Sequence, residues 1–455
     1  MAASSEAARR RGKGGAAKLP HGRERDALVF ASGAAAALLL FLLAAGHRAA
    51  FFTDDLPAAA LPTTTTRDDD GRRTFYDDPA FSYAVTGRRV AEWDAKRAAW
   101  LRSRGLTGAA APDRVLMVSG SQPEPCGGSG GDHLLLRFLK NKLDYCRLHG
   151  IELFYNRNFL EPSMPWAWSK LPVLRAAMVA HPEAEWLWWV DADAVLTDMD
   201  FSLLPLAATR YAGRNLVVHG NRERFFGRRS WLGINAGVFL IRNCQWSLDF
   251  LDEWARMGPA YPEQHAEWGK KLKNELAEKD SDFACDQSAL AYLLLDGWER
   301  RGFRDTVHVE TEYYLHGYWK DIVDRLPGVA ARYDAVERGT RAAGLRLRRR
   351  HAEREHLRYA AARNAAVRKA VPGPDGGSDD GWRRPFVTHF VGCAPCSGWQ
   401  NPAYAPESCG SGMRAALDFA DDQVLRAYGF RHAAPGNDSV HPLPFDYPAA
   451  PGRRT

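Results

Sequence analysis

The stretch "EWLWWVDADAVLTDMDF", Glu185 to Phe201, places three tryptophans within four residues directly before a run of aspartates. A short apolar run of this kind is typical of a buried strand. Carboxylates are rarely left fully buried without a partner, so a strand that stops at paired aspartates predicts a site at its end. Alternation along the chain directs Asp191 and Asp193 to the same side, and a metal ion is the expected partner.

Short apolar runs alternate with longer amphipathic ones on both sides of this stretch. The predicted strands are 114–120, 151–156, 186–190, 215–220 and 236–243, and the predicted helices are 134–149, 171–180, 246–257 and one beginning near Cys285. This alternation predicts an α/β domain with a mainly parallel sheet. In such a sheet, ligands bind beyond the carboxyl ends of the strands.

Four Asp-x-Asp triplets occur in the chain, beginning at residues 68, 191, 198 and 280. Only the triplet at 191 directly follows a predicted strand, so we expect the metal site there. Hard carboxylate oxygens suit Mg²⁺ or Mn²⁺, which complete their coordination with water and substrate phosphates. A nucleotide-sugar diphosphate is therefore a suitable substrate. The alternative is a pair of aspartates that cap a loop.

The 455 residues have an ordinary globular composition and a formal net charge of +6. Much of the basic excess lies near the N-terminus and around residues 338–369. Charge alone therefore gives no reason to expect a nucleic-acid partner.

Residues 27–46 carry no charge for twenty residues, close to the length that crosses a bilayer. The basic tail 1–26 precedes this segment, and the positive-inside bias puts it in the cytosol. We expect a single-pass signal anchor with a lumenal domain. A cleaved signal peptide is the alternative.

The remaining organisation follows from composition. Residues 47–112 are rich in Ala, Pro, Thr, Asp and Arg and predict a stem or linker. The catalytic domain is expected over 113–447, with a charged helical insertion and loop at 330–384, interrupted near Gly339 and Gly344, and a short tail at 448–455. The insertion indicates a solvated surface helix or helical hairpin, with a polyanion-binding face as the alternative.

Seven cysteines in a lumenal protein are able to form disulfides. Cys393, Cys396 and Cys409 lack a fourth zinc ligand at a familiar spacing, so a disulfide or a buried thiol is expected. The triplet Asn437-Asp438-Ser439 is a sequon for N-glycosylation at Asn437.

Seven motifs in one order carry a family resemblance. They are "SGSQPEPCG", "NKLDYCRLHGIELFYN", "PWAWSKLPVLRAAMVAHPEAEWLWWVDADAVLTDMDF", "NAGVFLIRNCQWSLDFLDEWARMGP", "DQSALAYLL", "YYLHGYW" and "RPFVTHFVGCAPCSG". Together they resemble the plant family of xyloglucan 6-xylosyltransferases and galactomannan galactosyltransferases. The resemblance implies a GT-A-type, Rossmann-like fold and a metal-dependent, retaining glycosyltransferase of hemicellulose, anchored in the Golgi membrane as a type II protein.

The same resemblance assigns roles to residues. Asp191, Asp193 and His389 match the metal ligands, and an imidazole ligand favours Mn²⁺ over Mg²⁺. Asp286 and Gln287 match the family's acidic-Gln pair near the reacting sugar, and the amide oxygen of Gln287 is expected beneath the anomeric carbon, where it stabilises oxocarbenium character. Asp286 beside it is the alternative nucleophile of a double displacement.

Further matched positions surround the donor. His316 matches a histidine that hydrogen-bonds to the leaving diphosphate. The expected donor-binding residues are Gly120, Ser121, Gln122, Ala192, Asn235 and Gly392. Taken without the resemblance, His389 is interpreted as a structural histidine, His316 as part of aromatic packing or of a platform on which an apolar sugar face stacks, and the segment at Cys285 as a helix N-cap.

Two positions depart from the xylosyltransferase pattern: Ala394 replaces a phosphate-facing lysine, and Cys285 replaces an acidic residue. Ala394, the insertion and the ending "VHPLPFDYPA" resemble the galactomannan branch. The implied reaction is α-galactosyl transfer from UDP-galactose to O6 of mannose in a β-1,4-mannan, and xylosyl transfer from UDP-xylose to a glucan is the alternative. A metal-dependent hydrolase and a non-catalytic partner of other Golgi transferases are the remaining alternatives.

Both acceptors are extended neutral chains, for which an open cleft with aromatic walls is expected. The candidates for these walls are Trp166, Trp168, Trp231, Trp319 and Trp399.

Overall fold

The computed structural model describes residues 75–107, 114–127, 129–342, 383–428, 430–432 and 439–442. All of them belong to one of two compact units, Phe75–Thr455. The expected basic tail 1–26, the anchor 27–46, the tail 448–455, Gly344 and Asn437 lie outside the described residues. No helix within the described ranges has the length and apolar character needed to span a membrane.

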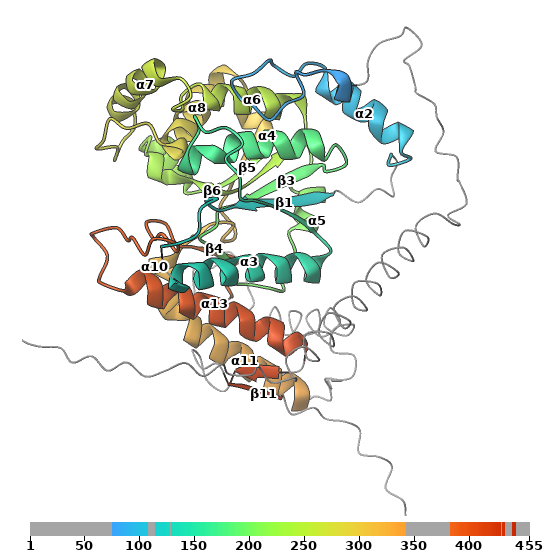
Figure 1. The fold of residues 1–455 in the computed structure, drawn as a ribbon. Helices are drawn as coiled ribbons and strands as arrows, with labels where there is room; N and C mark the ends of the chain where they lie inside the picture. Colours follow the sequence, from blue (N-terminus) through green and yellow to red (C-terminus); the bar gives the residue numbers. More distant parts are fainter. Residues whose placement is uncertain are drawn as a thin grey trace, which may run out of the picture. The chain divides into compact units, whose positions relative to one another are not determined.

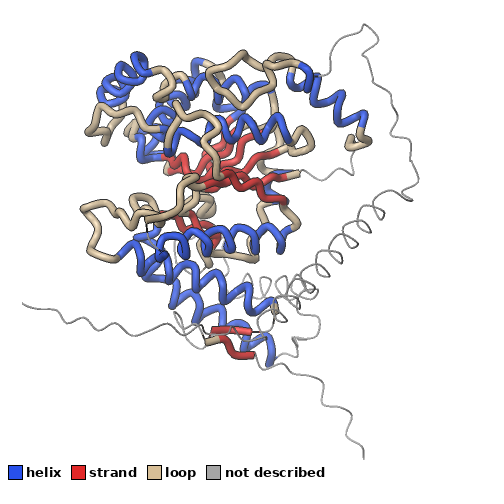
Figure 2. Tube along the Cα trace, viewed as in Figure 1, coloured by secondary structure: helices blue, strands red, loops and turns tan. Residues whose placement is uncertain are grey.

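A six-stranded sheet forms the centre of this unit (Figure 2). Its strands, in spatial order, are β2 (Glu152–Asn156), β1 (Val115–Gly120), β3 (Trp186–Val190), β6 (Ile234–Arg242), β5 (Leu216–Gly220) and β7 (Val307–Glu310). The pairs β1–β2, β1–β3 and β5–β7 are parallel, whereas β6 is antiparallel to both of its neighbours. The predicted α/β domain is confirmed, and its central sheet is mixed, with three parallel and two antiparallel strand pairs.

Helices cover both faces of the sheet (Figure 1). One face carries α4 (Lys170–Ala180), α6 (Gln245–Ala255) and α8 (Asp286–Arg300), and the other carries α3 (Ser129–His149) and α13 (Ser408–Ala427). Shorter or peripheral elements are α5 (Leu204–Ala208), α7 (Pro262–Glu275), α9 (Phe303–Thr306), α10 (Trp319–Ile322), η2 (Trp166–Ser169), η3 (Glu223–Gly227), η4 (Trp231–Gly233), η5 (Val323–Arg325), β10 (Phe430–His432) and β11 (Val440–Pro442).

Alternate residues of each strand enter different cores. In β3, Leu187 and Trp189 join the core under α4, α6 and α8, whereas Trp186 and Trp188 join the core under α3 and α13. All of these side chains are buried. A strand covered on both faces needs apolar residues at every position, which is why the run at 186–190 does not alternate with polar residues.

A second, three-stranded sheet brings the C-terminal part of the chain to the end of β3. Its order is β4 (Ala194–Leu196), β9 (Val387–His389) and β8 (Gly317–Tyr318). β4 and β9 pair antiparallel with Ala194 opposite His389, and β8 pairs parallel to β9 with Tyr318 opposite His389. This small sheet therefore fixes His389 beside the aspartates that follow β3.

The predicted linker, residues 47–112, is wrong in its C-terminal part, because the folded unit begins at Phe75. From Phe75 onward the chain forms η1 (Phe75–Asp77) and α2 (Trp93–Ser103), and Val85, Val90 and Trp93 are buried in the core under α4 and α6. Trp93 is the single buried residue of α2. Trp100, which is partly buried, also packs against this core, but two apolar contacts seven residues apart make too weak a helical periodicity to have predicted the helix.

The expected interruption near Gly339 is also wrong. Helix α11 (Leu326–Ala342) continues through that glycine, since one helical glycine costs only about 1 kcal/mol relative to alanine. Residues 343–382, the rest of the charged insertion, are outside the described ranges.

Two disulfides join the segments around the sheet edge. Cys393 pairs with Cys409, and Cys126 pairs with Cys396. Of the expected alternatives to a zinc site, a disulfide or a buried thiol, these cysteines form disulfides. The Cys126–Cys396 bond links the segment after β1 to the loop after β9. Gly131 permits this contact, because a Cβ there would collide with the Cys396 backbone.

Candidate active site

Three predicted ligands converge at the edge of the sheet. His389 Nε2 lies 3.0 Å from Asp193 Oδ1 and 3.7 Å from Asp191 Oδ2, and one ligand atom from each of the three residues lies within 4.8 Å of the others. Backbone hydrogen bonds hold the turn: Asp191 N–H donates to Gly237 O at 2.8 Å, and Phe390 N–H donates to Asp193 O at 3.1 Å.

Gly237 of β6 makes room for this cluster. A Cβ at this position would overlap the His389 ring and the Asp191 carboxylate. The glycine therefore allows the imidazole and the carboxylate to lie directly against the strand, a close approach that any side chain would prevent.

The donor set fits a divalent cation. Two carboxylate oxygens and one imidazole nitrogen suit Mn²⁺, which accepts both hard and borderline ligands. The Asp198/Asp200 triplet is engaged elsewhere, because Arg384 Nη1 lies 2.7 Å from Asp200 Oδ2 and 3.9 Å from Asp198 Oδ1. Of the triplets in the described ranges, the one at 191 forms a candidate metal cluster with a histidine. The site follows the strand after which it was predicted, and the histidine is the one that the family resemblance assigned.

A buried lysine that sequence reasoning missed connects the cluster to helix α8. Lys170 Nζ, at the start of α4, lies 2.7 Å from Asp286 Oδ2 and 3.4 Å from Asp191 Oδ1, and donates to Ala236 O at 2.8 Å. Burial lowers the pKa of Lys170, but the charges of Asp191 and Asp286 outweigh it and raise the pKa to about 12. The lysine therefore stays charged and ties the N-termini of α4 and α8 to the aspartate turn.

A second buried lysine supports the turn from the other face of the sheet. Lys142 Nζ of α3 donates to Ala192 O at 3.2 Å and to Ala194 O at 2.9 Å. Burial lowers its pKa to about 8, against the opposing effect of Asp193 and Asp191. The sequence carries a signal for this role, because Phe138, Lys142 and Tyr145 share one helical stripe and the other two members are buried.

Asn235 and Gln287, each predicted as a residue of the site, are hydrogen-bonded to each other. Gln287 Oε1 accepts from Asn235 Nδ2 at 3.1 Å and from Ala236 N–H at 3.3 Å, and its Nε2 donates to Trp231 O at 3.3 Å. Asn235 Oδ1 accepts from Gly237 N–H at 2.7 Å. This chain of bonds runs from α8 through β6 to the Gly237 carbonyl that accepts from Asp191 N–H.

Cys285, the second departure from the xylosyltransferase pattern, caps α8. Its Sγ accepts from Ser288 N–H at 3.5 Å, and Ser288 Oγ accepts from Cys285 N–H at 3.2 Å. The N-cap expected from the sequence and the placement of Asp286 and Gln287 at the site occur together, because both residues occupy the first turn of α8.

His316 lies on the other side of His389. Their ring centroids are 5.0 Å apart in an edge-to-face arrangement, and His219 of β5 lies 6.0 Å from His316. Burial, with the charge of His389 adding to it, holds the pKa of His316 well below its usual value. Its buried Nε2 has no hydrogen-bond partner among the described residues. A neutral imidazole with an unsatisfied nitrogen is thus available to a ligand.

The remaining donor-binding candidates lie at the ends of β1 and β9. β1 and β3 pair in parallel with Val118 opposite Trp189, so Gly120 and Ser121 follow at the same sheet edge as Asp191. Gln122 Nε2 lies 2.8 Å from Cys396 Sγ. Gly392 adopts a left-handed backbone (φ 80°) in the loop after His389. Gly120 also has a packing role, because a Cβ there would meet Asn156 O of β2.

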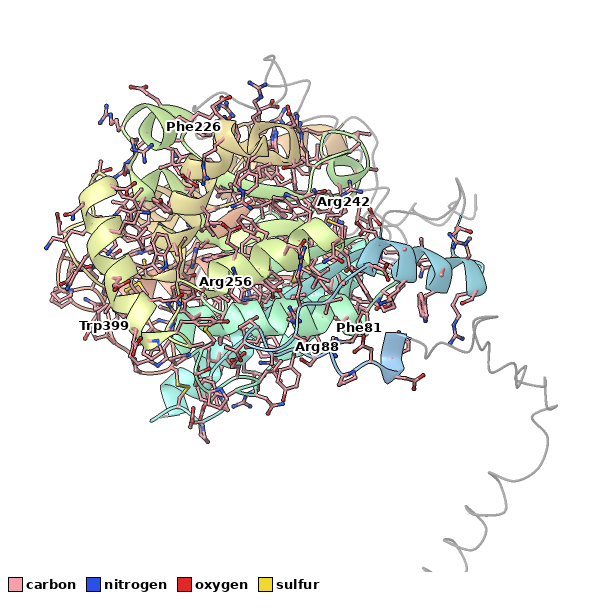
Figure 3. The ribbon with its side chains drawn as sticks, turned by 90° about the horizontal axis from the view of Figure 1, so that it is seen from above. Phe81, Arg88, Phe226, Arg242, Arg256 and Trp399 are labelled. Atoms are coloured by element: carbon pink, nitrogen blue, oxygen red, sulfur yellow. A yellow bond between two sulfur atoms is a disulfide. The ribbon has the colours of Figure 1, made fainter. Side chains whose placement is uncertain are left out.

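The five candidate tryptophans separate into two groups. Trp168 and Trp319 are buried and cannot line an open cleft, so their assignment was wrong. Trp231 is partly buried, whereas Trp166 is 84% exposed and Trp399 is 57% exposed. Figure 3 shows Trp399 at the side of the unit away from α2.

Comparison with known proteins supplies the class to which this fold and cluster belong. The chain is a glycosyltransferase with a GT-A-like α/β domain. It belongs to the galactosyl transferase GMA12/MNN10 family, whose model matches residues 111–400.

The similar proteins are plant glycosyltransferases. A probable glycosyltransferase 6 of Oryza sativa subsp. indica is 62% identical over 385 residues, which cover 83% of this chain and 78% of that protein. A probable glycosyltransferase 7 from the same source is 58% identical over 377 residues, covering 83% and 81%. Galactomannan galactosyltransferase 1 of Cyamopsis tetragonoloba is 49% identical over 377 residues, covering 83% and 82%. The family predicted from the seven motifs is confirmed.

Proposed function

We propose that this glycosyltransferase transfers an α-galactosyl residue from UDP-galactose to O6 of mannose in a β-1,4-mannan, with retention of configuration and with Mn²⁺. The convergence of Asp191, Asp193 and His389 at the edge of the sheet carries the proposal, because it is suited to a cation that binds a diphosphate. The donor and acceptor are suggested by the galactomannan galactosyltransferase that is 49% identical.

Asp191, Asp193 and His389 would hold the cation, which when bound supplies positive charge to neutralise the departing diphosphate. The chain's own residues keep this site in place. Lys170 and Trp189 Nε1 orient Asp191 through bonds of 3.4 and 2.5 Å to its Oδ1, leaving Oδ2 directed to His389. Lys142 fixes the carbonyls on either side of Asp193.

In the proposed transfer, the bond between the anomeric carbon and the diphosphate oxygen breaks, and the acceptor O6 bonds to the same face of that carbon. The acceptor proton passes to the departing diphosphate. Gln287 directs its amide dipole at the developing positive charge, and its three hydrogen bonds fix that direction in advance.

The ion pair of Asp286 favours this single displacement over a double one. Asp286 is buried, and Lys170 Nζ lies 2.7 Å from its Oδ2. A carboxylate held in a buried ion pair is a weak nucleophile, because attack would leave the lysine charge unpaired. We therefore assign Asp286 to positioning α8.

His316 completes the site as a donor to the diphosphate. A neutral imidazole carries one N–H. With that hydrogen on the buried Nε2, which lacks a partner among the described residues, the ring would donate to a phosphate oxygen. Gly120, Ser121, Gln122, Ala192 and Gly392 remain proposed donor contacts at the same edge.

The proposal extends to cellular location. Residues 27–46 would anchor the chain in the Golgi membrane, with the domain from Phe75 onward in the lumen and Asn437 as an acceptor for N-glycosylation. Two disulfides support a lumenal domain, since such bonds persist in oxidising compartments. Other Golgi transferases are the proposed protein partners.

Specificity is tested by offering the purified chain UDP-galactose or UDP-xylose with mannohexaose or cellohexaose and identifying the product by mass spectrometry and NMR. We expect galactosyl-mannohexaose with an α linkage. Xylosyl-cellohexaose would instead establish the xyloglucan activity. Free sugar without an oligosaccharide product would indicate a hydrolase, and no turnover by a folded chain would indicate a non-catalytic partner.

Gln287→Ala is expected to lower kcat about a hundredfold, because one preorganised polar group at the reacting centre contributes on this order. The affinity for UDP should change by less than about twofold, since Gln287 interacts with the sugar and not with the nucleotide. Steady-state kinetics and calorimetric UDP titration measure the two effects. An unchanged kcat with a large loss of UDP affinity would contradict this role.

A further inference from the structure

Three exposed apolar side chains lie close in sequence to residues of the candidate site, although each belongs to a well-packed segment. Trp166 is 84% exposed, Phe283 is 55% exposed and Leu232 is 42% exposed. Each lies three or four residues before a residue of the site: Trp166 before Lys170, Phe283 before Asp286, and Leu232 before Asn235. Exposed side chains gathered at one site indicate a binding surface, whereas scattered ones do not.

The three segments meet at the site. Lys170 is ion-paired with Asp286 at 2.7 Å, which joins the segment of Trp166 to that of Phe283. Gln287 bonds to Asn235 and to the carbonyl of Trp231, which joins the segment of Leu232. Ring contacts from Trp168 to His265 (6.1 Å) and from His265 to Phe283 (5.4 Å) connect the first two segments a second time.

Trp166 is held in place by its neighbours. Met164 and Trp168 on either side are buried in the core, and Trp168 N–H donates to Pro165 O at 3.2 Å. The backbone of Trp166 adopts the left-handed region (φ 53°), which is uncommon for a large side chain. Such residues persist where the surroundings fix them, and they are frequent at binding sites. The fold therefore accepts a backbone cost to keep this indole exposed.

Phe283 is fixed in the same manner. The buried Lys279 donates to Phe283 O at 2.7 Å and to Ser281 O at 2.9 Å, and Ala284 is fully buried. Gly269 of α7 lies so close to this loop that a Cβ would overlap Asp282 O. The loop is thus rigid, and its phenyl ring points outward.

We propose that Trp166, Phe283 and Leu232 form the wall on which an extended neutral β-1,4-linked oligosaccharide lies as acceptor. This inference rests on the proposed function for the chemistry of its ligand. Sugar rings of such chains present C–H faces that stack on aromatic side chains, and a backbone that is already fixed lowers the ordering cost of binding. The location next to Gln287 and Asp286 places the acceptor beside the sugar that it receives.

The test measures binding without turnover. Full-length chain in mild detergent, loaded with UDP and Mn²⁺, is titrated with mannohexaose and with cellohexaose by calorimetry. We expect Trp166→Ala to weaken binding of the preferred oligosaccharide about five- to tenfold, and Trp166→Tyr to weaken it less than about threefold. UDP affinity should be unchanged in both variants. Tyr83→Ala, which removes an exposed aromatic ring outside the wall, is the matched control and should bind as wild type.

Several results would overturn the proposal. One is that Trp166→Ala binds the oligosaccharide with wild-type affinity, or that Tyr83→Ala loses as much affinity as Trp166→Ala. Another is that the wild-type chain binds neither oligosaccharide. A third is that Trp166→Ala changes only the self-association of the chain, measured by sedimentation, and not its oligosaccharide affinity. Failure of the proposed function is separate, since UDP binding and sugar transfer are measured independently. Phe283→Ala provides a second variant, for which we expect a loss of about threefold or more; wild-type affinity in this variant would remove Phe283 from the wall.

Discussion

Asp193→Ala is expected to reduce sugar transfer at least about a thousandfold, because it removes a carboxylate that the cation needs in order to stabilise the diphosphate, a contribution of several kcal/mol. The fold should persist. Within the described part of the chain, the Asp193 carboxylate bonds to His389, whereas the Asp191 carboxylate also binds Lys170 and Trp189. Asp193 is therefore the cleaner substitution of the two.

Transfer and Mn²⁺ affinity are measured together, with thermal unfolding in metal-free buffer as the check on folding. Asp280→Ala is the matched control: it removes an exposed aspartate from another Asp-x-Asp triplet and should retain full activity. Ordinary transfer by Asp193→Ala at controlled Mn²⁺ concentration would refute the ligand assignment.

Lys170→Met is expected to lower the free energy of unfolding by about 3–5 kcal/mol, the usual cost when one partner of a buried ion pair is removed. The substitution leaves Asp286 buried without its cation and removes a contact of Asp191. Urea denaturation in metal-free buffer at neutral pH gives the value.

Two further variants isolate the cause. Lys140→Met also removes a lysine bonded to two carboxylates, Asp144 and Asp421, but its side chain is 55% exposed, so the loss should stay below about 1 kcal/mol. The double variant Lys170→Met with Asp286→Asn should recover part of the stability, because no unpaired carboxylate remains at residue 286. If Lys170→Met lowers the free energy of unfolding no more than Lys140→Met does, the buried ion pair between Lys170 and Asp286 does not stabilise the fold.

The central strands were predictable because their signal is local. Each buried strand is a short apolar run, and the predicted and observed bounds at 186–190 coincide. The aspartate turn was predictable for the same reason, since its position after a buried strand distinguishes it from three similar triplets. The pairing of His389 with Asp193, 196 residues apart in sequence, was inferred from the family resemblance and not from any local pattern.

The two buried lysines beside the aspartate turn, Lys142 and Lys170, escaped prediction because a lysine is ordinarily exposed. Lys142 lies on an apolar helical stripe, and that position was a usable signal. The role of Lys170 could not be predicted without knowing that it pairs with Asp286, which lies 116 residues later in the sequence and contacts it only in the folded protein. The wrong assignments of Trp168 and Trp319 have a related origin. The sequence predicts that aromatic side chains line the acceptor cleft, but it does not show which tryptophans are buried in the core instead.

The measurement that tests the account most directly is transfer from UDP-galactose to mannohexaose by the metal-free chain as Mn²⁺ is added back. We predict transfer that is absent with chelator, that rises with Mn²⁺ to saturation, and that yields an α-linked product. Equal transfer with chelator and with Mn²⁺ would contradict the role assigned to Asp191, Asp193 and His389.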